Sequence, residues 1–189
     1  MHMITLKQVE PVHDIDALVQ LAHDIWFEYW PRLIGEDQTR YMVERFQSAT
    51  AITNDIAEHN YEYYFIIDDA DKAVGYVGIA PERFADMPDD PRADAHSNAI
   101  TLLYPDRLFI SKIYLLAEER GKHYASQILA QLADRARDLG LSGMYLTVNK
   151  RNELGIRAYK GNGFEVIEAV SADIGKGFVM DDYIMARAV

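Results

Sequence analysis

A short basic turn has the residue types and the spacing of an anion-binding site. Arg120-Gly121-Lys122 places two cations around a glycine, directly before a segment whose apolar residues follow helical spacing. Such a turn presents backbone N–H groups and the positive end of the helix dipole to an anion, which favours a phosphate or a pyrophosphate. An exposed basic turn without a ligand is the competing interpretation, because this tripeptide is common.

The residues around this turn exclude two familiar phosphate loops. The chain has no G-x-x-x-x-G-K-S/T, which excludes a P-loop NTPase. It has no G-x-G-x-x-G after the preceding apolar run, which excludes a dinucleotide-binding site of the Rossmann type. Where a second glycine would be expected, the chain has His123. We expect His123 in the first turn of the helix, with ordinary backbone angles and its amide still directed at the ligand.

Hydrophobic periodicity predicts the elements that must position this turn. Strands are expected at Met3–Val9, Tyr61–Ile67, Val74–Ala80, Leu108–Leu116, Met144–Val148, Phe164–Val170 and Phe178–Arg187. Helices are expected at Asp14–Trp30, at Asp37–His59 with a break and a cap near Ser48, after the basic turn as far as Gly140, and at Asn152–Asn162. The strand–helix–strand unit over Leu108–Val148 should have parallel strands. Residues 81–107 are predicted to be a surface excursion that includes a short strand at Ile100–Tyr104.

Composition limits the fold and the compartment. The 189 residues suffice for one domain, so we expect a single α+β domain over residues 1–189, with a mixed twisted sheet of about seven strands and flanking helices. No apolar run is long enough to span a bilayer, and the N-terminus does not have the pattern of a secretory signal. The chain has no cysteine, which removes disulfides and thiolate chemistry and fits a cytoplasmic protein.

Charge and histidine spacing limit the partners. The formal net charge of -11 disfavours nucleic acid and anionic membrane surfaces and mildly favours cationic ligands. The six histidines are scattered, without the spacing of a metal site, so no metal is expected.

The basic turn and a second motif together resemble the GNAT acetyltransferase superfamily. That family carries Q/R-x-x-G-x-G/A between a buried strand and a helix; here Arg120 opens the motif, Ala125 closes it, and His123 replaces a glycine. The second motif, Asn-x-x-Ala/Gly followed by a tyrosine and Gly-Phe, is matched by "NELGIRAYKGNGF" at residues 152–164. The segments "IGEDQTRYMVERFQS", "LFISKIYLL" and "VMDDYIMARA" look closest to the PaiA-like group of small-amine acetyltransferases.

This resemblance implies a fold, a reaction and a set of cofactor-binding residues. The strands before and after the helix are expected to splay apart, and the acetyl group of acetyl-CoA is expected to pass directly to a primary amine in a ternary complex, with a polyamine as a candidate acceptor. The residues that the family would use for acetyl-CoA are Ile113, Tyr114, Leu115, Arg120, Gly121, Lys122, His123, Tyr124, Ala125, Ser126, Asn152 and Tyr159.

The resemblance also implies a general acid but leaves the base open. Tyr159 matches the tyrosine that protonates the departing thiolate, and an unperturbed pKa near 10 suits that role. A core tyrosine is the competing interpretation. In the branch that acetylates ribosomal proteins, a glutamate five residues before the asparagine is the base, but here that position is Thr147. Asp181 and Asp182 are candidates near the amine, and they could equally be edge-strand charges that discourage aggregation; ordered water is a third alternative.

The acceptor is expected to contact aromatic and acidic side chains of the first helices. Such groups suit an alkylammonium, and the substrate candidates are Trp26, Tyr29, Trp30, Glu36 and Asp182. Because Trp26 and Tyr29 fall on the apolar face of their helix, a core role is the alternative for both.

A small-molecule amine is the expected partner, and a homodimer is left open. The alternative functions are acetylation of a protein N-terminus or lysine, a catalytically silent CoA-binding or sensing module, and an unrelated nucleotide-binding protein.

Overall fold

The computed structural model describes residues 3–83 and 98–189, and it divides into two units. The first unit contains Met1–Ala80 and Lys112–Ile128, and the second contains Pro81–Ser111 and Leu129–Val189. Each unit is described by itself below. Among the described residues, no helix combines the length and the low charge needed to cross a membrane.

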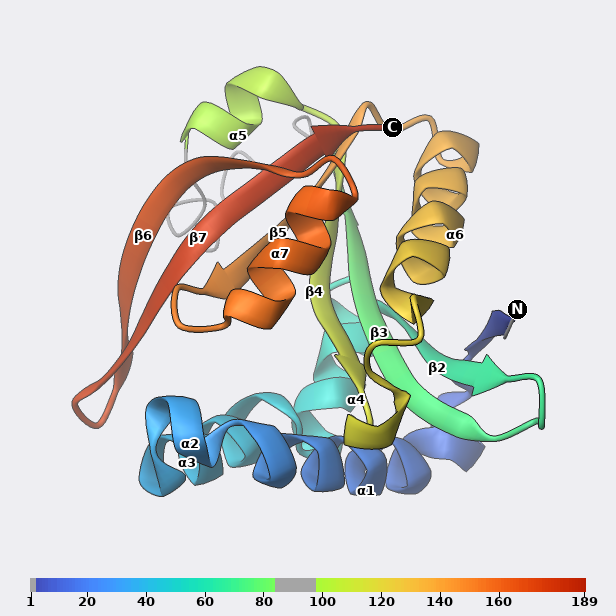
Figure 1. Cartoon of the computed structure of the whole chain (residues 1–189), viewed down its shortest axis with the longest axis vertical. Helices are drawn as coiled ribbons and strands as arrows, with labels where there is room; N and C mark the ends of the chain where they lie inside the picture. Colours follow the sequence, from blue (N-terminus) through green and yellow to red (C-terminus); the bar gives the residue numbers. More distant parts are fainter. Residues whose placement is uncertain (1–2, 84–97) are drawn as a thin grey trace. The chain divides into compact units, whose positions relative to one another are not determined.

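The first unit contains three antiparallel strands and the helices that follow the first of them (Figure 1). Its strands are β1 (Ile4–Gln8), β2 (Glu62–Asp68) and β3 (Ala73–Glu82), and its helices are α1 (Pro11–Tyr29), α2 (Pro31–Ile34), α3 (Glu36–Phe46) and α4 (Ala49–Glu58). β1 pairs with β2, and β2 pairs with β3. The end of β4 (Arg107–Leu115), the short 3-10 helix η3 (Ala117–Glu119) and the first turn of α6 (Tyr124–Asp138) complete this unit.

The core of the first unit lies between α1, α4 and the sheet. Leu18, Ala22 and Ile25 form the buried face of α1, and the helical spacing of the sequence predicts this face. They pack in one cluster with Ile52 of α4 and with Tyr63, Phe65 and Tyr76 of the strands. The predicted break at Ser48 is confirmed, because its hydroxyl oxygen accepts a hydrogen bond from the amide of Ala51 at 3.3 Å and caps α4. α1 ends at Tyr29, one residue before the expected end, and Pro31 begins the short helix α2, which the sequence did not indicate.

The second unit contains the remaining strands. β5 (Gly143–Asn149) pairs with β7 (Phe178–Ala188), and β7 pairs with β6 (Glu165–Gly175), both in antiparallel register. β4 and β5 are parallel, as the strand–helix–strand pattern predicts, and their register runs from Arg107 opposite Gly143 to Ile110 opposite Leu146. The pairing therefore ends while β5 still has three residues to run. Helix α7 (Glu153–Gly161) follows β5 (Figure 1).

The strands follow the order β1-β2-β3-β4-β5-β7-β6 in a seven-stranded sheet. Parallel pairing of β4 with β5 beside antiparallel neighbours makes this sheet mixed. The α+β class with a mixed sheet and one parallel pair, expected from the sequence, is confirmed.

The predicted strand at Ile100–Tyr104 is wrong, because residues 98–103 form helix α5 (Asn98–Leu103). A short apolar run has no periodicity that separates a strand from a helix. In the structure Ile100 is buried against Tyr145, Ile184 and Ala186, so one face of a helical turn is sufficient to cover this part of the sheet. The rest of the predicted excursion, residues 84–97, lies outside the described residues.

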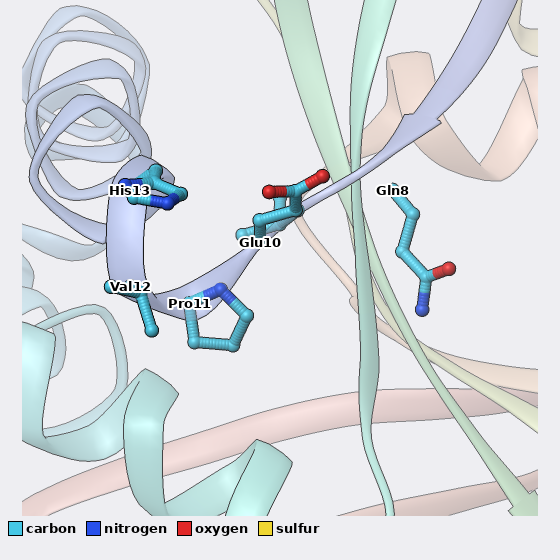
Figure 2. Close-up of a pocket in the computed structure, with 6 residues that line it drawn as sticks. Gln8, Glu10, Pro11, Val12 and His13 are labelled. Carbon is cyan, nitrogen blue, oxygen red and sulfur yellow. The ribbon is translucent and has the colours of Figure 1, made fainter.

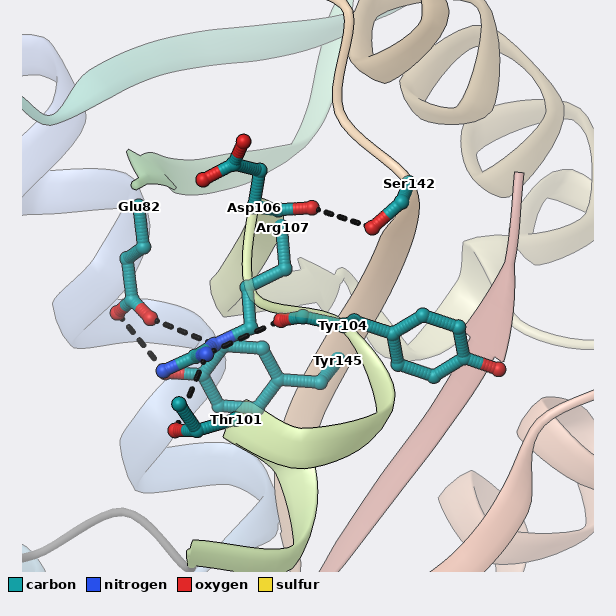
Figure 3. A network of polar contacts seen from close by, with 7 residues as sticks. All are labelled: Glu82, Thr101, Tyr104, Asp106, Arg107, Ser142 and Tyr145. Carbon is teal, nitrogen blue, oxygen red and sulfur yellow. Dashed lines mark hydrogen bonds and ion pairs between the residues drawn. The ribbon is translucent and has the colours of Figure 1, made fainter. Parts of the chain in front are cut away.

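A buried arginine joins α5 to the beginning of β4 (Figure 3). Arg107 is 1 % exposed, and its Nε donates to Glu82 Oε2 at 3.0 Å. Its Nη1 donates to the hydroxyl of Thr101 at 3.3 Å and to the carbonyl of Tyr104 at 3.1 Å, and the hydroxyl of Tyr145 donates to the same Glu82 carboxylate at 2.8 Å. The charge of Arg107 is thus compensated within a fully hydrogen-bonded network, which a buried ion pair requires.

Gly75 of β3 provides a test of the packing in the first unit. A β-carbon at this position would lie 2.2 Å from the backbone carbonyl oxygen of Tyr114, so Gly75→Ala must push two strand backbones apart. We expect a loss of about 1–3 kcal/mol or more in the free energy of unfolding, measured by urea denaturation. Gly161→Ala is the matched control, because nothing lies within 4 Å of its added carbon. Equal stability of the two variants would contradict this packing.

Candidate active site

The basic turn lies between the end of β4 and the beginning of α6, but its arginine faces the protein. Arg120 donates from Nε and Nη2 to the carbonyl of Leu115, at 3.1 and 3.0 Å. The same Nη2 donates to Glu28 of α1 at 2.7 Å. The expectation that Arg120 adds an uncompensated charge to the turn is therefore wrong for this conformation. Glu28 lies 92 residues before Arg120 in the chain, so the sequence does not indicate that the two side chains meet.

Lys122 is also paired with a carboxylate. Its Nζ donates to Glu119 of η3 at 2.7 Å, and this hydrogen bond raises the pKa of Lys122. Gly121 turns the chain with a φ of 81°, as expected, and α6 begins at Tyr124. The amides that lack helical acceptors are therefore those of residues 123–126, which lie within the 121–126 range that the sequence indicated. The anion-binding capacity of this turn resides in these amides and the helix dipole.

His123 has a φ of 62°, in the left-handed region, and the prediction of ordinary helical angles is wrong. The residue precedes the first turn of α6 instead of belonging to it. A β-carbon is disfavoured in this conformation, whereas glycine adopts it freely. Histidine tolerates it better than most residues. A glycine at this place in the GNAT motif thus has a conformational reason, and His123 keeps the turn at a cost in strain.

An aromatic cluster fills the first unit beside the end of β4. Trp26 stacks on Trp30 with ring centroids 5.2 Å apart, and Tyr114 lies 5.4 Å from Trp26 and 6.4 Å from Trp30. Trp26 donates to the hydroxyl of Tyr76 at 3.1 Å. Trp26 and Trp30 are 2 % and 8 % exposed, so the core interpretation holds for Trp26 and extends to Trp30.

The predicted substrate groups of the first unit are already engaged by arginines. The guanidinium carbons of Arg32 and Arg120 lie 4.6 and 4.7 Å from the ring centroid of Tyr29. Glu36 is exposed and accepts a hydrogen bond from Arg40 at 3.1 Å, one helical turn away. A cationic substrate would have to displace an arginine at either residue.

Lys112 is a buried cation on β4, directly before the predicted cofactor-binding residues Ile113–Leu115. Its Nζ donates to Asp55 of α4 at 3.2 Å and lies 5.2 and 5.1 Å from the ring centroids of Tyr61 and Tyr63. Tyr63 also donates to Asp55, at 2.6 Å. Burial lowers the pKa of Lys112, and the carboxylate of Asp55 partly offsets this effect. The side chain is held in an enclosed structural pair.

In the second unit, the caps of α7 explain the Asn-x-x-Gly and Gly-Phe signatures. The side-chain oxygen of Asn152 accepts a hydrogen bond from the amide of Gly155 at 3.0 Å and caps the first turn. At the other end, Gly163 has a φ of 82°, and its amide donates to the carbonyl of Lys160 at 3.1 Å. The amide of Phe164 donates to the carbonyl of Tyr159 at 3.1 Å, which completes a Schellman motif.

These caps fix Tyr159 on the last turn of α7. Its ring centroid lies 6.0 Å from that of the buried Phe164, the apolar contact that accompanies such a cap. Tyr159 is half-buried. A purely structural role would favour complete burial, but the general-acid role of Tyr159 stays a prediction.

Asp182 differs most from its sequence-based interpretation. β7 lies between β5 and β6, so Asp182 is no edge-strand charge. The residue is 6 % exposed, and its Oδ1 accepts one long hydrogen bond, 3.4 Å, from Asn149 Nδ2. Burial is the main cause that raises the pKa of Asp182 to about 6; the Asn149 hydrogen bond lowers the pKa, Asp181 raises it and Lys150 lowers it. The neighbouring Asp181 is exposed and pairs with Lys150.

The predicted site residues thus form two groups. The first unit brings together Leu115, Arg120, Tyr29 and Trp30, with Ile113, Tyr114 and the turn at 121–126 beside them in sequence. The second unit holds Asn152, Tyr159 and Asp182. Sequence reasoning did not indicate that Glu28 pairs with Arg120, and it missed Asn149, the partner of Asp182. Only the position of Asn149 at the end of a predicted strand could have indicated it. Among the described residues, no cluster of three or more His, Asp or Glu side chains is arranged to hold a metal ion.

A hollow at the junction of β1 and α1 has no comparable arrangement (Figure 2). It is lined by six consecutive residues, Gln8 to His13, most of them exposed. Glu10 and His13 reach different parts of it, and the amide of Glu10 is used to cap α1 through Asp14. One short exposed segment does not supply the convergent polar groups of an active site.

Comparison with protein families gives a match to the Acetyltransferase (GNAT) family over residues 16–164. This range includes the basic turn, Asn152 and Tyr159. Comparison with curated proteins gives no match.

Solved structures with a similar fold are acetyltransferases. The PaiA N-acetyltransferase of Thermoplasma acidophilum in complex with coenzyme A aligns with a TM-score of 0.70 and 14 % identity, covering 99 % of both chains. The spermidine N-acetyltransferase of Vibrio cholerae in complex with CoA and spermine aligns with a TM-score of 0.60 and 16 % identity, covering 98 % of this chain and 95 % of that one. A dodecameric structure of the Vibrio cholerae enzyme has a TM-score of 0.61 and 17 % identity, covering 98 % of this chain and 93 % of that one.

The left-handed conformation of His123 predicts a gain in stability when glycine replaces it. Removing the β-carbon relieves a strain of about 1–2 kcal/mol, and the entropy of the unfolded glycine cancels about 0.5–1 kcal/mol of this. We expect His123→Gly to be as stable as the wild type or up to about 1 kcal/mol more stable in urea denaturation. Ser126→Gly, within α6, should instead lose about 0.5 kcal/mol. A clear loss at His123→Gly would mean that the imidazole makes a stabilising contact.

The buried carboxyl of Asp182 predicts a pH-dependent stability. Because the folded chain holds this proton more tightly than the unfolded chain, the carboxyl favours folding below pH 4 and this contribution is lost as the pH rises through about 6. The rise from 3.8 to about 6 corresponds to about 3 kcal/mol at most. The stability advantage of Asp182→Asn over the wild type should therefore grow between pH 4 and pH 7 in urea denaturation. Asp181→Asn is the control, and an advantage of Asp182→Asn that does not vary with pH would contradict the assignment.

Proposed function

Because the chain belongs to the GNAT acetyltransferase family, we propose that it transfers the acetyl group of acetyl-CoA to a primary amine of a small molecule, such as a polyamine. The transfer is direct, within a ternary complex. The observation that carries the proposal is the join between β4 and α6, where a strand end, a basic turn and a helix N-terminus follow one another inside the matched range. Two neighbours of the same fold were solved with coenzyme A.

The proposed cofactor contacts divide into backbone and side-chain groups. The backbone of Ile113–Leu115 holds the pantetheine arm, and the amides at the start of α6 hold the pyrophosphate. Arg120 and Lys122 are paired with carboxylates in the free chain, so their part is to shape the turn and to exchange partners when a phosphate arrives. Asn152, at the beginning of α7, contributes a further contact to the cofactor.

Acetyl transfer then requires an acid at the thiol side of the reaction. Attack of the amine nitrogen on the thioester carbon forms the C–N bond and breaks the C–S bond, and the departing thiolate needs a proton. Tyr159 supplies it, because the caps of α7 hold this tyrosine at a defined position and its ring is only half-buried. The hydroxyl recovers a proton from the new amide nitrogen.

A small amine suits the electrostatics of this chain. The net charge of -11 attracts a polycation from solution, and the effect weakens with added salt. Acetylation of a protein N-terminus or lysine is the same-fold alternative, and a silent CoA-binding module is the alternative of another class. A homodimer and a cytoplasmic location stay predictions from the sequence.

Thiol release from acetyl-CoA with spermidine as acceptor tests this function, with Tyr159→Phe beside the wild type. The substitution keeps the ring and removes the acidic proton, so kcat should fall by roughly 100- to 10,000-fold. The dissociation constant of acetyl-CoA should barely change, and acetyl-CoA at 100 times this constant should stabilise both proteins by about 2.7 kcal/mol. Stabilisation without turnover, with spermidine or other amines, would favour the silent module. Equal turnover of both proteins would remove Tyr159 from the reaction.

A further inference from the structure

We propose that Asp182 is the general base of this enzyme and that its carboxylate receives the acceptor as an ammonium ion. The inference rests on the proposed function and assigns the deprotonation step, for which the sequence favoured no residue. It is carried by the strand on which Asp182 lies, the face that it occupies and the partners that surround it.

Asp182 lies at the end of β5 that the parallel partner does not cover. In the antiparallel register, Asp182 is opposite Asn149, the last residue of β5, and Ile184 is opposite Thr147. The parallel register of β5 with β4 ends at Leu146. Asp182 and Asn149 therefore belong to the part of β5 and β7 that lies beyond the paired segment of β4. Where a strand extends beyond its hydrogen-bonded partner, its backbone groups and side chains can contact a ligand.

The surroundings of Asp182 leave its charge poorly compensated. Opposite residues of an antiparallel pair share a face, so the side chain lies beside Asn149 from β5 and Val170 from β6. Asn149 donates one long hydrogen bond, and Val170 offers nothing polar. The charged groups that act on the pKa of Asp182 are Lys150, whose ammonium pairs with Asp181, and Asp181 itself. Within residues 3–83 and 98–189, no ion pair is formed by Asp182, although a buried carboxylate needs a cation.

An ammonium ion is a ligand that matches this arrangement. It carries one positive charge and several N–H donors, which match a carboxylate with open acceptor positions. The carboxylates and aromatic ring that the first helices offer are already engaged by Arg120, Arg40 and Arg32. Among the described residues, no arginine pairs with Asp182, and the nearby Lys150 pairs with Asp181.

Asp182 and Tyr159 act from opposite faces of the β5–β7 pair. Side chains alternate along a strand, so Asp182 shares a face with Ile184 and Ala186, which α5 covers through Ile100. Arg187 is on the other face, where it donates to the carbonyl of Asn162 at 2.9 Å and lies 5.5 Å from the ring centroid of Phe164. Asn162 and Phe164 belong to the C-terminal cap of α7, the helix that carries Tyr159. An acid and a base on different faces can serve a leaving group and a nucleophile without exchanging their proton.

The protons balance across the reaction. The Asp182 carboxylate takes one proton from the R–NH₃⁺ acceptor and later gives it to solvent. The neutral amine attacks the thioester carbon of acetyl-CoA, and the C–S bond breaks. The second proton of the nitrogen replaces the proton that Tyr159 gives to the thiolate. The net products are the acetamide, the CoA thiol and one released proton. A carboxyl whose pKa is about 6 is largely ionised at neutral pH and is a stronger base than an ordinary aspartate.

The test compares Asp182→Asn, Asp182→Glu and Asp181→Asn with the wild type in thiol release from acetyl-CoA, with spermidine as the acceptor, from pH 5 to 9. For Asp182→Asn we expect kcat to fall by roughly 100- to 10,000-fold and the acidic limb of kcat/KM near pH 6 to disappear. The acetyl-CoA dissociation constant should stay within about twofold, because the substitution leaves the proposed cofactor contacts intact. Asp182→Glu should keep the limb with reduced turnover, and Asp181→Asn should keep both turnover and limb.

The outcomes separate this inference from the proposed function. An active wild type with an equally active Asp182→Asn, or with an unchanged acidic limb in that variant, overturns the assignment of Asp182 and leaves the acetyltransferase function intact. A wild type that releases no thiol with spermidine or any other amine tested overturns the proposed function and this inference together. A melting temperature of Asp182→Asn at or above that of the wild type at pH 7 shows that lost turnover is not lost folding.

Discussion

The buried ion pair between Arg107 and Glu82 is the constraint on which the geometry of the second unit depends. Its guanidinium ties the beginning of β4 to α5, and its carboxylate partner also holds the hydroxyl of Tyr145 on β5. Removing one partner of such a pair would leave an uncompensated charge in the core, so alternative registers are strongly disfavoured. The register that it fixes begins at Arg107 and Gly143 and ends after four residues, so Asn149 and Asp182 lie beyond the paired segment of β4.

The motifs that define the family have local physical causes in this chain. Asn152 and Gly163 are the two caps of α7, and together they determine where Tyr159 lies along the helix. The glycine expected at position 123 is required by a left-handed turn, which His123 adopts at a cost. The motifs thus determine how α6 begins and how α7 is capped. The residues with proposed chemical roles are held in place by these helix ends.

The sequence predicted well what depends on local pattern. Helix α1, the Ser48 cap, the parallel β4–β5 pair and the end of α6 just before Gly140 follow from periodicity and capping residues. What it did not predict depends on distant partners. Glu28 reaches Arg120 across 92 residues, and Asp182 is buried only because β7 is inserted between β5 and β6. Helix α5 was missed for a related reason, since Arg107 and the apolar face of the sheet stabilise a segment too short to show a period.

The enclosure of Lys112 has a consequence for the chemical durability of the protein. Burial shifts this amine toward its neutral form, which is the form that reacts with thioesters. It belongs to the strand that is proposed to hold an activated acyl donor, so an accessible Lys112 would invite self-acylation and loss of its pairing with Asp55. The rings of Tyr61 and Tyr63 lie over this amine. They hinder the approach of an electrophile, which the lowered pKa of Lys112 would otherwise favour. Steric shielding by these rings therefore adds to the pairing with Asp55 in limiting reaction at this amine.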